Sequence, residues 1–105
     1  MLEPLLESSV KERILLFIHT HGESYPREIA KSLGLNVNAV QYQLFKLENG
    51  LVLYSNLRGR IRLFGFNPRY PFQKELEAML NKALLFVPEA ERQKIYTPRR
   101  RPRYL

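Results

Sequence analysis

The chain has 105 residues, a net charge of +7 and an isoelectric point near 10.0. Its length suits one domain with a single core, and a content of 45% hydrophobic and 26% charged residues is typical of a folded protein. It contains no cysteine, which excludes disulfides, thiolate catalysis and thiol metal sites. No apolar run approaches the roughly 18 residues of a membrane span, and the start MLEPLLESS lacks the basic residues of a signal peptide. We therefore expect a cytoplasmic protein.

The positive charge is confined to the second half of the chain. Residues 1–50 contain five Lys and Arg against six Glu, whereas residues 51–105 contain twelve against four. The stretches 55–71 and 92–105 contain no acid at all. Such a basic half indicates a polyanionic partner, most often nucleic acid, and a generic solubilising charge is the alternative.

The first predicted helix begins at a capping box and ends near Gly22. In this box Ser9 and Glu12 each accept a hydrogen bond from an unpaired amide. Apolar residues follow at helical spacing, which indicates a core helix. They are Val10, Ile14, Leu15, Phe17 and Ile18.

The next two predicted helices are separated by a tight turn. Pro26 suits the first position of a short helix, and Gly34 suits a left-handed stop. Asn36 then caps a third helix, over residues 37–48. This order predicts a helix-turn-helix.

The third helix has two different sides when it is phased at about 100° per residue. Val40, Leu44 and Leu47 share the side that we expect to be buried. The outward side is built from amide and aromatic residues. It consists of Asn38, Tyr42 and Phe45, flanked by Gln41 and Lys46.

Two short strands, 51–55 and 60–64, follow around a turn at 56–59. Alternation along the second strand places Ile61 and Leu63 on one side, and Arg60, Arg62 and Phe64 on the other. A hairpin directly after a helix-turn-helix is a wing. We expect its tip to carry Arg58 and Arg60.

Helical spacing returns over 72–87 and ends at Pro88. A lone amphipathic helix of this kind commonly packs on the first helix or on a second subunit. We therefore divide the chain into a winged helix-turn-helix domain at 1–70, a helical segment at 71–96 for dimerisation, and a flexible basic tail at 97–105.

Three features resemble the winged helix-turn-helix domain of ArsR/MarR-like transcriptional regulators over residues 9–68. They are the run IAKSLGL, the spacing V-x-x-x-L-x-x-LE-x-GL that ends at Leu51, and the hairpin with a basic tip. The run RGRIRLFGFNPRYPFQKELEAMLNKAL is further similar to a subset of these regulators, often associated with nucleotidyltransferase domains, in which an Asn-Pro turn precedes a C-terminal helix.

The resemblance implies a mainly α fold with a small β-hairpin, consisting of a three-helix core, a two-stranded wing and a C-terminal helix. It also implies a two-fold dimer whose helix 37–48 lies in the major groove of DNA, with the wing along the backbone or minor groove. The sequence departs from the family at Tyr42 and Gln43, where Arg or His is common, and at Phe45, where Lys or Arg is common.

We expect Asn38, Gln41 and Tyr42 to contact bases. A carboxamide donates and accepts at once, so Asn38 and Gln41 suit the N6 and N7 atoms of adenine. A solvated polar face is the alternative for these three residues. Phe45 we expect to pack against another element or subunit.

The backbone or minor-groove contacts that we expect come mainly from arginine. Ser24 and Tyr25, near the start of the second helix, could also offer an amide or hydroxyl to a phosphate. The expected basic contacts are Arg27, Lys46, Arg58, Arg60 and Arg62, with Arg99, Arg100, Arg101 and Arg103 in the tail.

We expect no metal, cofactor or catalytic site. His19 and His21 are two residues apart on one helix, so they point to different faces. No paired nucleophile and base is visible, and the chain has no Asp. The chain is therefore not expected to be an enzyme.

The predicted function is a homodimeric, sequence-specific regulator of transcription that binds double-stranded DNA as a repressor or autoregulator. The alternative is a protein-interaction winged helix, such as the antitoxin or partner of a nucleotidyltransferase, with the basic tail on an acidic enzyme. RNA binding is a weaker third reading, because the exposed aromatics form no stacking platform on a sheet.

Overall fold

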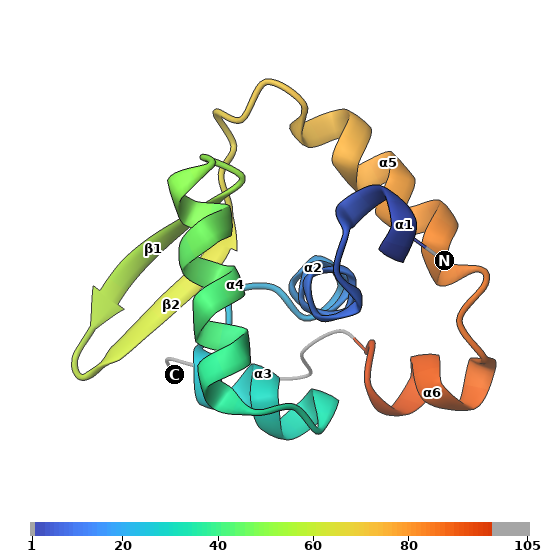
Figure 1. Cartoon of the computed structure of the whole chain (residues 1–105), viewed down its shortest axis with the longest axis horizontal. Coiled ribbons are helices and arrows are strands. Elements are labelled where there is room, and N and C mark those ends of the chain that lie inside the picture. The colour runs from blue at the N-terminus through green and yellow to red at the C-terminus, as the bar shows by residue number, and fades with distance from the viewer. Residues whose placement is uncertain (1, 98–105) are drawn as a thin grey trace.

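Within residues 2–97, the part that this computed structural model describes, the chain forms helices and one antiparallel β-hairpin (Figure 1). The elements are α1 (Glu3–Leu6), α2 (Ser9–His21), α3 (Pro26–Leu33), α4 (Val37–Asn49), β1 (Leu53–Arg58), β2 (Ile61–Phe66), α5 (Gln73–Leu84) and α6 (Glu89–Lys94). In this range no helix is long and apolar enough to cross a membrane. The mainly α architecture with a hairpin wing follows the predicted order.

The start of α2 differs from the prediction by one residue. Ser8, not Ser9, has the extended backbone of a cap, and its Oγ accepts a hydrogen bond from the amide of Lys11 at 3.0 Å. The carboxylate of Glu12 accepts from the amide of Leu2 at 2.6 Å. The predicted capping box at Ser9 is therefore wrong, because α1 packs on α2 and brings its own amide to Glu12.

The helix-turn-helix forms as its local signals predict. Pro26 occupies the first turn of α3, and Gly34 ends the helix with a left-handed φ of 67° while its amide donates to Ala30. Asn36 caps α4 through its side chain, which accepts from the amide of Asn38 at 2.7 Å. Each boundary depends on residues close in sequence.

The strands of the hairpin begin and end one to three residues further along the chain than predicted. Leu51 and Val52, expected in the first strand, instead close the end of α4, since their amides donate to carbonyls of that helix at 3.0 Å. Leu51 has a left-handed φ of 66°. The strand prediction at 51–52 is thus wrong.

The turn of the hairpin consists of two residues. Arg58 pairs with Ile61, which leaves Gly59 and Arg60 at the tip. Gly59 has a φ of 62°, a value that glycine adopts freely at the first position of a two-residue turn. The tip therefore carries Arg58 and Arg60, as expected.

The root of the hairpin is buried on both faces. Leu63 and Phe64 are adjacent in β2, so they point to opposite faces of the hairpin, and both are fully buried. Two backbone hydrogen bonds, of 3.1 and 2.7 Å, join Phe64 to Ser24 and add a third chain segment beside β2. α2 also packs against this strand.

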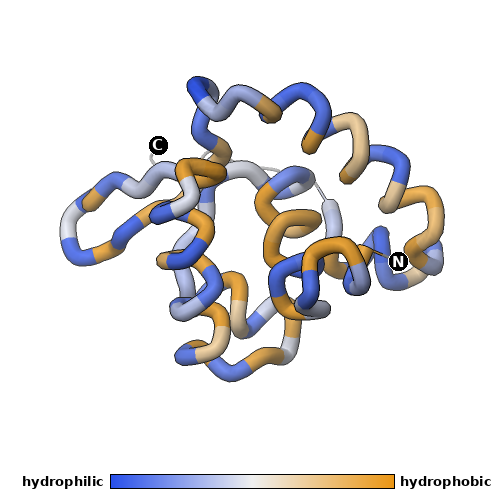
Figure 2. Tube along the Cα trace, turned by 45° about the horizontal axis from the view of Figure 1, so that its top comes forward, coloured by the Kyte–Doolittle hydropathy of each residue, from blue (hydrophilic) through white to orange (hydrophobic). Residues whose placement is uncertain are grey.

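The C-terminal helices share the core of the helix-turn-helix. Leu80 and Ala83 of α5 belong to the same buried cluster as α2, and so does Tyr96 after α6. In Figure 2 hydrophobic stretches gather around α2, while the tip of the hairpin at the left is mostly hydrophilic. Helix α5 ends at Leu84, before the predicted 87, and α1 and α6 are two short helices that the sequence pattern does not predict.

Candidate nucleic-acid interface

Helix α4 presents a polar and aromatic face to solvent. Val40, Leu44 and Leu47 are buried on the opposite side, as the helical phasing predicts. The residues expected to point outward are all exposed. They are Asn38, Gln41, Tyr42, Phe45 and Lys46.

Aromatic contacts support this exposed face. The Nζ of Lys46 lies 5.2 Å from the centre of the Tyr42 ring, within cation–π range. The ring of Phe45 meets the edge of Phe64 in the hairpin, with ring centres 6.1 Å apart. Phe45 therefore packs against the wing with part of its surface, as expected, although 44% of the side chain remains exposed.

A hollow of about 410 Å³ lies between the start of α3, the outer face of α4 and the hairpin. No acidic residue of the described range 2–97 lines it. It brings together five of the residues expected to contact nucleic acid: Arg27, Asn38, Gln41, Arg60 and Arg62. The remaining lining residues are Tyr25, Pro26, Val37 and Ile61.

Other candidate residues lie outside this hollow. Tyr42 and Lys46 are further around α4. Arg58 pairs with Ile61 and Arg62 with Leu57, so strand alternation places Arg58 on the opposite face of the hairpin from Arg62. The four tail candidates, Arg99, Arg100, Arg101 and Arg103, fall outside the described residues.

Ser24 is unsuited to the phosphate contact expected of it. The residue is fully buried, and its amide donates to the carbonyl of Phe64. Its hydroxyl donates to Glu28 at 2.5 Å. Tyr25, by contrast, lines the hollow.

The side chain of Tyr54 ties the wing to the segment before α3. Its hydroxyl donates a hydrogen bond to Glu23. Burial first, and then the hydrogen bond and the charge of Glu23, raise the pKa of Tyr54 to about 12, while the charge of Arg58 acts in the opposite direction. The phenol therefore remains neutral and continues to donate at physiological pH.

A second link joins α4 to both strands. The hydroxyl of Ser55 donates to Glu48 at 2.5 Å and accepts from the guanidinium of Arg62 at 3.0 Å. The hairpin itself contains no acidic residue. The carboxylate at the end of this link is therefore that of Glu48 in α4, which Arg62 reaches through the Ser55 hydroxyl. Sequence reasoning misses Glu48 and Ser55, because their proximity depends on the strand register and no short motif signals it.

The two histidines are engaged separately. His19 hydrogen-bonds Asn81 at 2.7 Å, whereas His21 lies 3.4 Å from Glu28 and stacks on Phe17. Within residues 2–97 no group of three or more metal-ligating side chains comes together.

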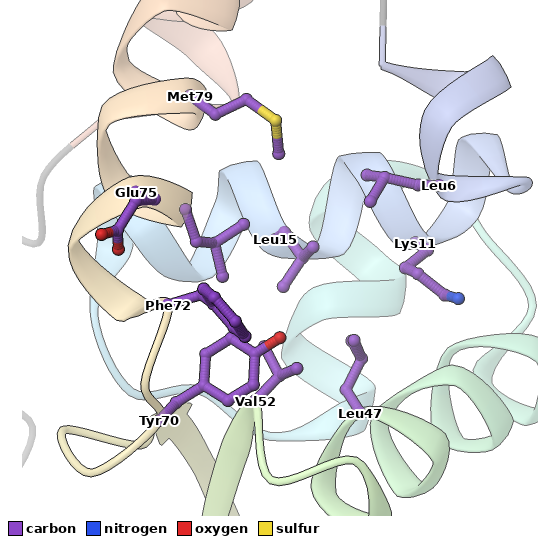
Figure 3. Close-up of a pocket in the computed structure, with 10 residues that line it drawn as sticks. Leu6, Lys11, Leu15, Leu47, Val52, Tyr70, Phe72, Glu75 and Met79 are labelled. Atoms are coloured by element: carbon purple, nitrogen blue, oxygen red, sulfur yellow. The ribbon is translucent and has the colours of Figure 1, made fainter.

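A separate apolar groove of about 390 Å³ lies on another part of the molecule (Figure 3). It runs between α1, α2, the end of α4 and the start of α5, and within residues 2–97 none of the residues expected to contact nucleic acid lines it. In the part of the chain that the structure describes, Lys11 and Glu75 are the charged residues that line it. The other lining residues are Leu6, Leu15, Leu47, Val52, Tyr70, Phe72, Leu76 and Met79.

Solved bacterial structures share this fold. YusO from Bacillus subtilis aligns with a TM-score of 0.61 and 18% identity, over 88% of this chain and 73% of that chain. A ZitR variant from Lactococcus lactis aligns with a TM-score of 0.60 and 23% identity, over 88% and 76%. MepR, a transcription regulator of the Staphylococcus aureus multidrug efflux pump MepA, aligns with a TM-score of 0.61 and 17% identity, over 88% and 74%.

A MepR variant bound to an oligodeoxyribonucleotide also aligns, with a TM-score of 0.56 and 20% identity over 88% of this chain and 74% of that chain. The sequence of this chain matches no protein-family model and no curated protein. At these identities the similarity is one of fold, and it confirms the predicted winged helix-turn-helix.

Proposed function

We propose that this chain is a sequence-specific transcriptional regulator that binds double-stranded DNA. The observation that carries the proposal is the hollow between α4 and the wing, where two carboxamides lie among three arginines and no acid among the described residues lines the wall. Arginine and carboxamide side chains are the groups that proteins use most to contact phosphates and base edges.

In this proposal α4 lies in the major groove. Asn38 and Gln41 are both exposed on α4. Their carboxamides are uncharged, so they neither attract nor repel the phosphates. Each carboxamide can form a bidentate pair with adenine. Tyr42 extends the same face and contacts a thymine methyl, a sugar or a phosphate.

The wing and the start of α3 supply attraction to the DNA backbone. Arg27 of α3 and the hairpin residues Arg60 and Arg62 line one hollow. Lys46 and Arg58 contact phosphates beyond it, and the arginines of the tail add further contacts. Affinity therefore depends on charge outside α4, since Lys46 is the only basic residue of that helix.

The assembly that we propose is a homodimer acting in the cytoplasm as a repressor or autoregulator. The apolar face of α2 is already buried within the chain, so it does not form the dimer contact. Exposed apolar side chains near the end of α5, Leu85 and Phe86, offer the surface instead. The similarity of fold to MepR, a transcription regulator of an efflux pump, supports a regulatory role.

The test is a selection of duplexes from a random library by the wild-type protein, followed by binding titrations. We expect a selected duplex to bind about 1,000-fold or more tightly than a scrambled duplex of the same composition. Affinity should fall as salt rises, because neutralising phosphates releases counterions. Selection of no consensus, with equal affinity for both duplexes, would show that the chain does not read sequence.

A further inference from the structure

Three elements contribute to one chain of hydrogen bonds beside the hollow. Glu48 lies in the last turns of α4, Ser55 in β1 and Arg62 in β2. A serine hydroxyl has one proton and can also accept. Its proton is donated to Glu48 at 2.5 Å, so its oxygen is left to accept from the Nη1 of Arg62 at 3.0 Å.

Strand register makes this chain possible. Arg62 is paired with Leu57, two residues from Ser55, and alternation places all three side chains on the face of the hairpin that meets α4. Glu48 is on the helix that carries Asn38 and Gln41. The position of the guanidinium is therefore set by the same helix as the two carboxamides.

We propose that Glu48 and Ser55 are positioning residues, which hold the Arg62 guanidinium ready for a DNA phosphate next to the bases that α4 reads. This inference depends on the proposed DNA-binding function. One N–H of Arg62 is used by Ser55, and a guanidinium has several others to offer a phosphate in a fixed planar geometry. A side chain that is ordered before binding loses less conformational freedom on binding.

The proposal and simple electrostatics predict opposite effects of removing Glu48 on DNA binding. Glu48 is an anion on a helix that approaches a polyanion, so charge alone predicts that its removal strengthens binding to any duplex. If Glu48 positions Arg62, its removal weakens binding to the selected duplex. The two effects are separated by comparing the selected and scrambled duplexes.

The experiment measures dissociation constants for the wild-type-selected duplex by fluorescence anisotropy. Ser55→Ala and Glu48→Ala should each weaken binding by about 3- to 10-fold, the range expected when one long side chain loses its order. Ser55→Thr, which keeps the hydroxyl, should restore binding to near the wild-type level. In an Arg62→Ala background, Ser55→Ala should have no further effect.

Tyr54→Phe is the matched control. It removes a hydroxyl-to-glutamate hydrogen bond from the neighbouring residue of the same strand, on the opposite face and with no link to Arg62. We expect it to leave binding unchanged. An equal loss in Tyr54→Phe and Ser55→Ala would overturn the proposal, because general loosening of the wing would then explain both. Tighter binding of the selected duplex by Glu48→Ala would overturn it as well.

A second readout uses the protein without DNA. The ¹⁵N relaxation order parameter of the Arg62 Nε should exceed that of Arg60, which has no hydrogen bond within residues 2–97, and should fall in Ser55→Ala. Equal order parameters for the two arginines would refute the positioning. If the wild type binds no duplex selectively, the proposed function fails, and the order parameters still decide whether Arg62 is held.

Discussion

Asn38 and Gln41 differ from the arginines around them in the kind of contact that they can make. A carboxamide distinguishes bases by pairing a donor with an acceptor, whereas an arginine next to the backbone attracts any phosphate. Arg60 lies at the tip of the hairpin on the wall of the same hollow. Two kinds of substitution should therefore have different effects.

Replacement of Asn38 or Gln41 by Ala should cost about 1–3 kcal/mol of binding free energy on the selected duplex and much less on a scrambled one. Arg60→Ala should weaken binding to both duplexes alike and reduce the slope of log K against log salt by about one. Anisotropy titrations of both duplexes at several salt concentrations measure these effects. If the Asn38 and Gln41 variants lost equal binding free energy on the two duplexes, the proposed difference between base-contacting carboxamides and phosphate-contacting arginines would be wrong.

Tyr54 gives the folded state a dependence on alkaline pH. Its pKa is raised from 10.0 to about 12, with burial as the largest cause, so the folded protein favours the neutral phenol. This contribution to stability is complete below pH 10 and is lost as pH rises towards 12. We expect the free energy of unfolding of the wild type to fall more steeply above pH 10 than that of Tyr54→Phe.

Urea unfolding of both proteins on either side of pH 10 measures this difference. Burial also raises the pKa of Tyr96. Because Tyr96 is present in both proteins, the difference between their pH profiles is due to Tyr54. Parallel pH profiles for the wild type and Tyr54→Phe would show that the Tyr54 phenol titrates normally.

At the scale of elements, the hairpin depends on a glycine that lies beneath an aromatic ring. Gly65 is paired with Tyr54, and a Cβ added at Gly65 would lie 2.7 Å from the phenol oxygen and 2.9 Å from its ring carbon. Gly65→Ala should therefore displace the ring and destabilise the protein by about 1–3 kcal/mol.

A double-mutant cycle tests the cause of this destabilisation. In a Tyr54→Ala background the ring is absent, so Gly65→Ala should cost much less than it does in the wild type. The free energies of unfolding of the four proteins give the coupling. If Gly65→Ala lowered the free energy of unfolding equally in the two backgrounds, a clash with the Tyr54 ring would not be the cause.

Local signals allowed the helix-turn-helix to be predicted from the sequence. These signals operate within four residues along the chain: Pro26 begins α3, Gly34 ends it and Asn36 caps α4. The pattern of exposed and buried residues along α4 follows from helical periodicity alone. The hairpin was displaced in the prediction because Leu51, which is not a glycine, adopts a left-handed φ. The burial of Phe64 could not be predicted either, since it depends on Ser24, forty residues earlier in the chain.

The candidate interface shows the same limit. Sequence reasoning named Arg27, Gln41 and Arg62 individually, and the fold brings these three residues into one hollow. The link from Glu48 through Ser55 was missed, because it requires the strand register that the prediction displaced. Short-range signals thus predict helix α4 and its exposed face, and long-range packing determines what surrounds it.

At the scale of the whole molecule, part of the exposed apolar surface lies just after α5, outside the hollow between α4 and the wing. Leu85, just after α5, is 73% exposed. In a dimer this side chain would be covered, so Leu85→Glu should weaken self-association and change the stability of the isolated fold by less than about 0.5 kcal/mol. Sedimentation equilibrium measures the dissociation.

Leu57→Glu is the control for this change, since Leu57 is 63% exposed but lies in the wing. It should leave self-association intact. A monomeric wild type, or equal dissociation of both variants, would contradict a dimer contact at the end of α5.

The uneven charge of the chain also has a consequence at this scale. Residues 51–105 hold twelve of the seventeen basic residues, and four of these lie between residues 99 and 103. If the tail binds DNA, a protein ending at Thr97 should show a salt slope smaller by about 0.9 for each phosphate that the tail neutralises in the full chain. An unchanged slope would assign the tail a role other than DNA binding.

The bridge between Ser24 and Phe64 anchors the root of the hairpin to the core, whereas residues 56–62 at its outer end are exposed. Insertions at Gly59 would therefore lengthen the wing without disturbing packed side chains. Because strand faces alternate, a two-residue extension within a strand would keep each existing side chain on its face, whereas a single added residue would exchange the faces. The wing would then lengthen in steps of two residues per strand while α4 stays unchanged.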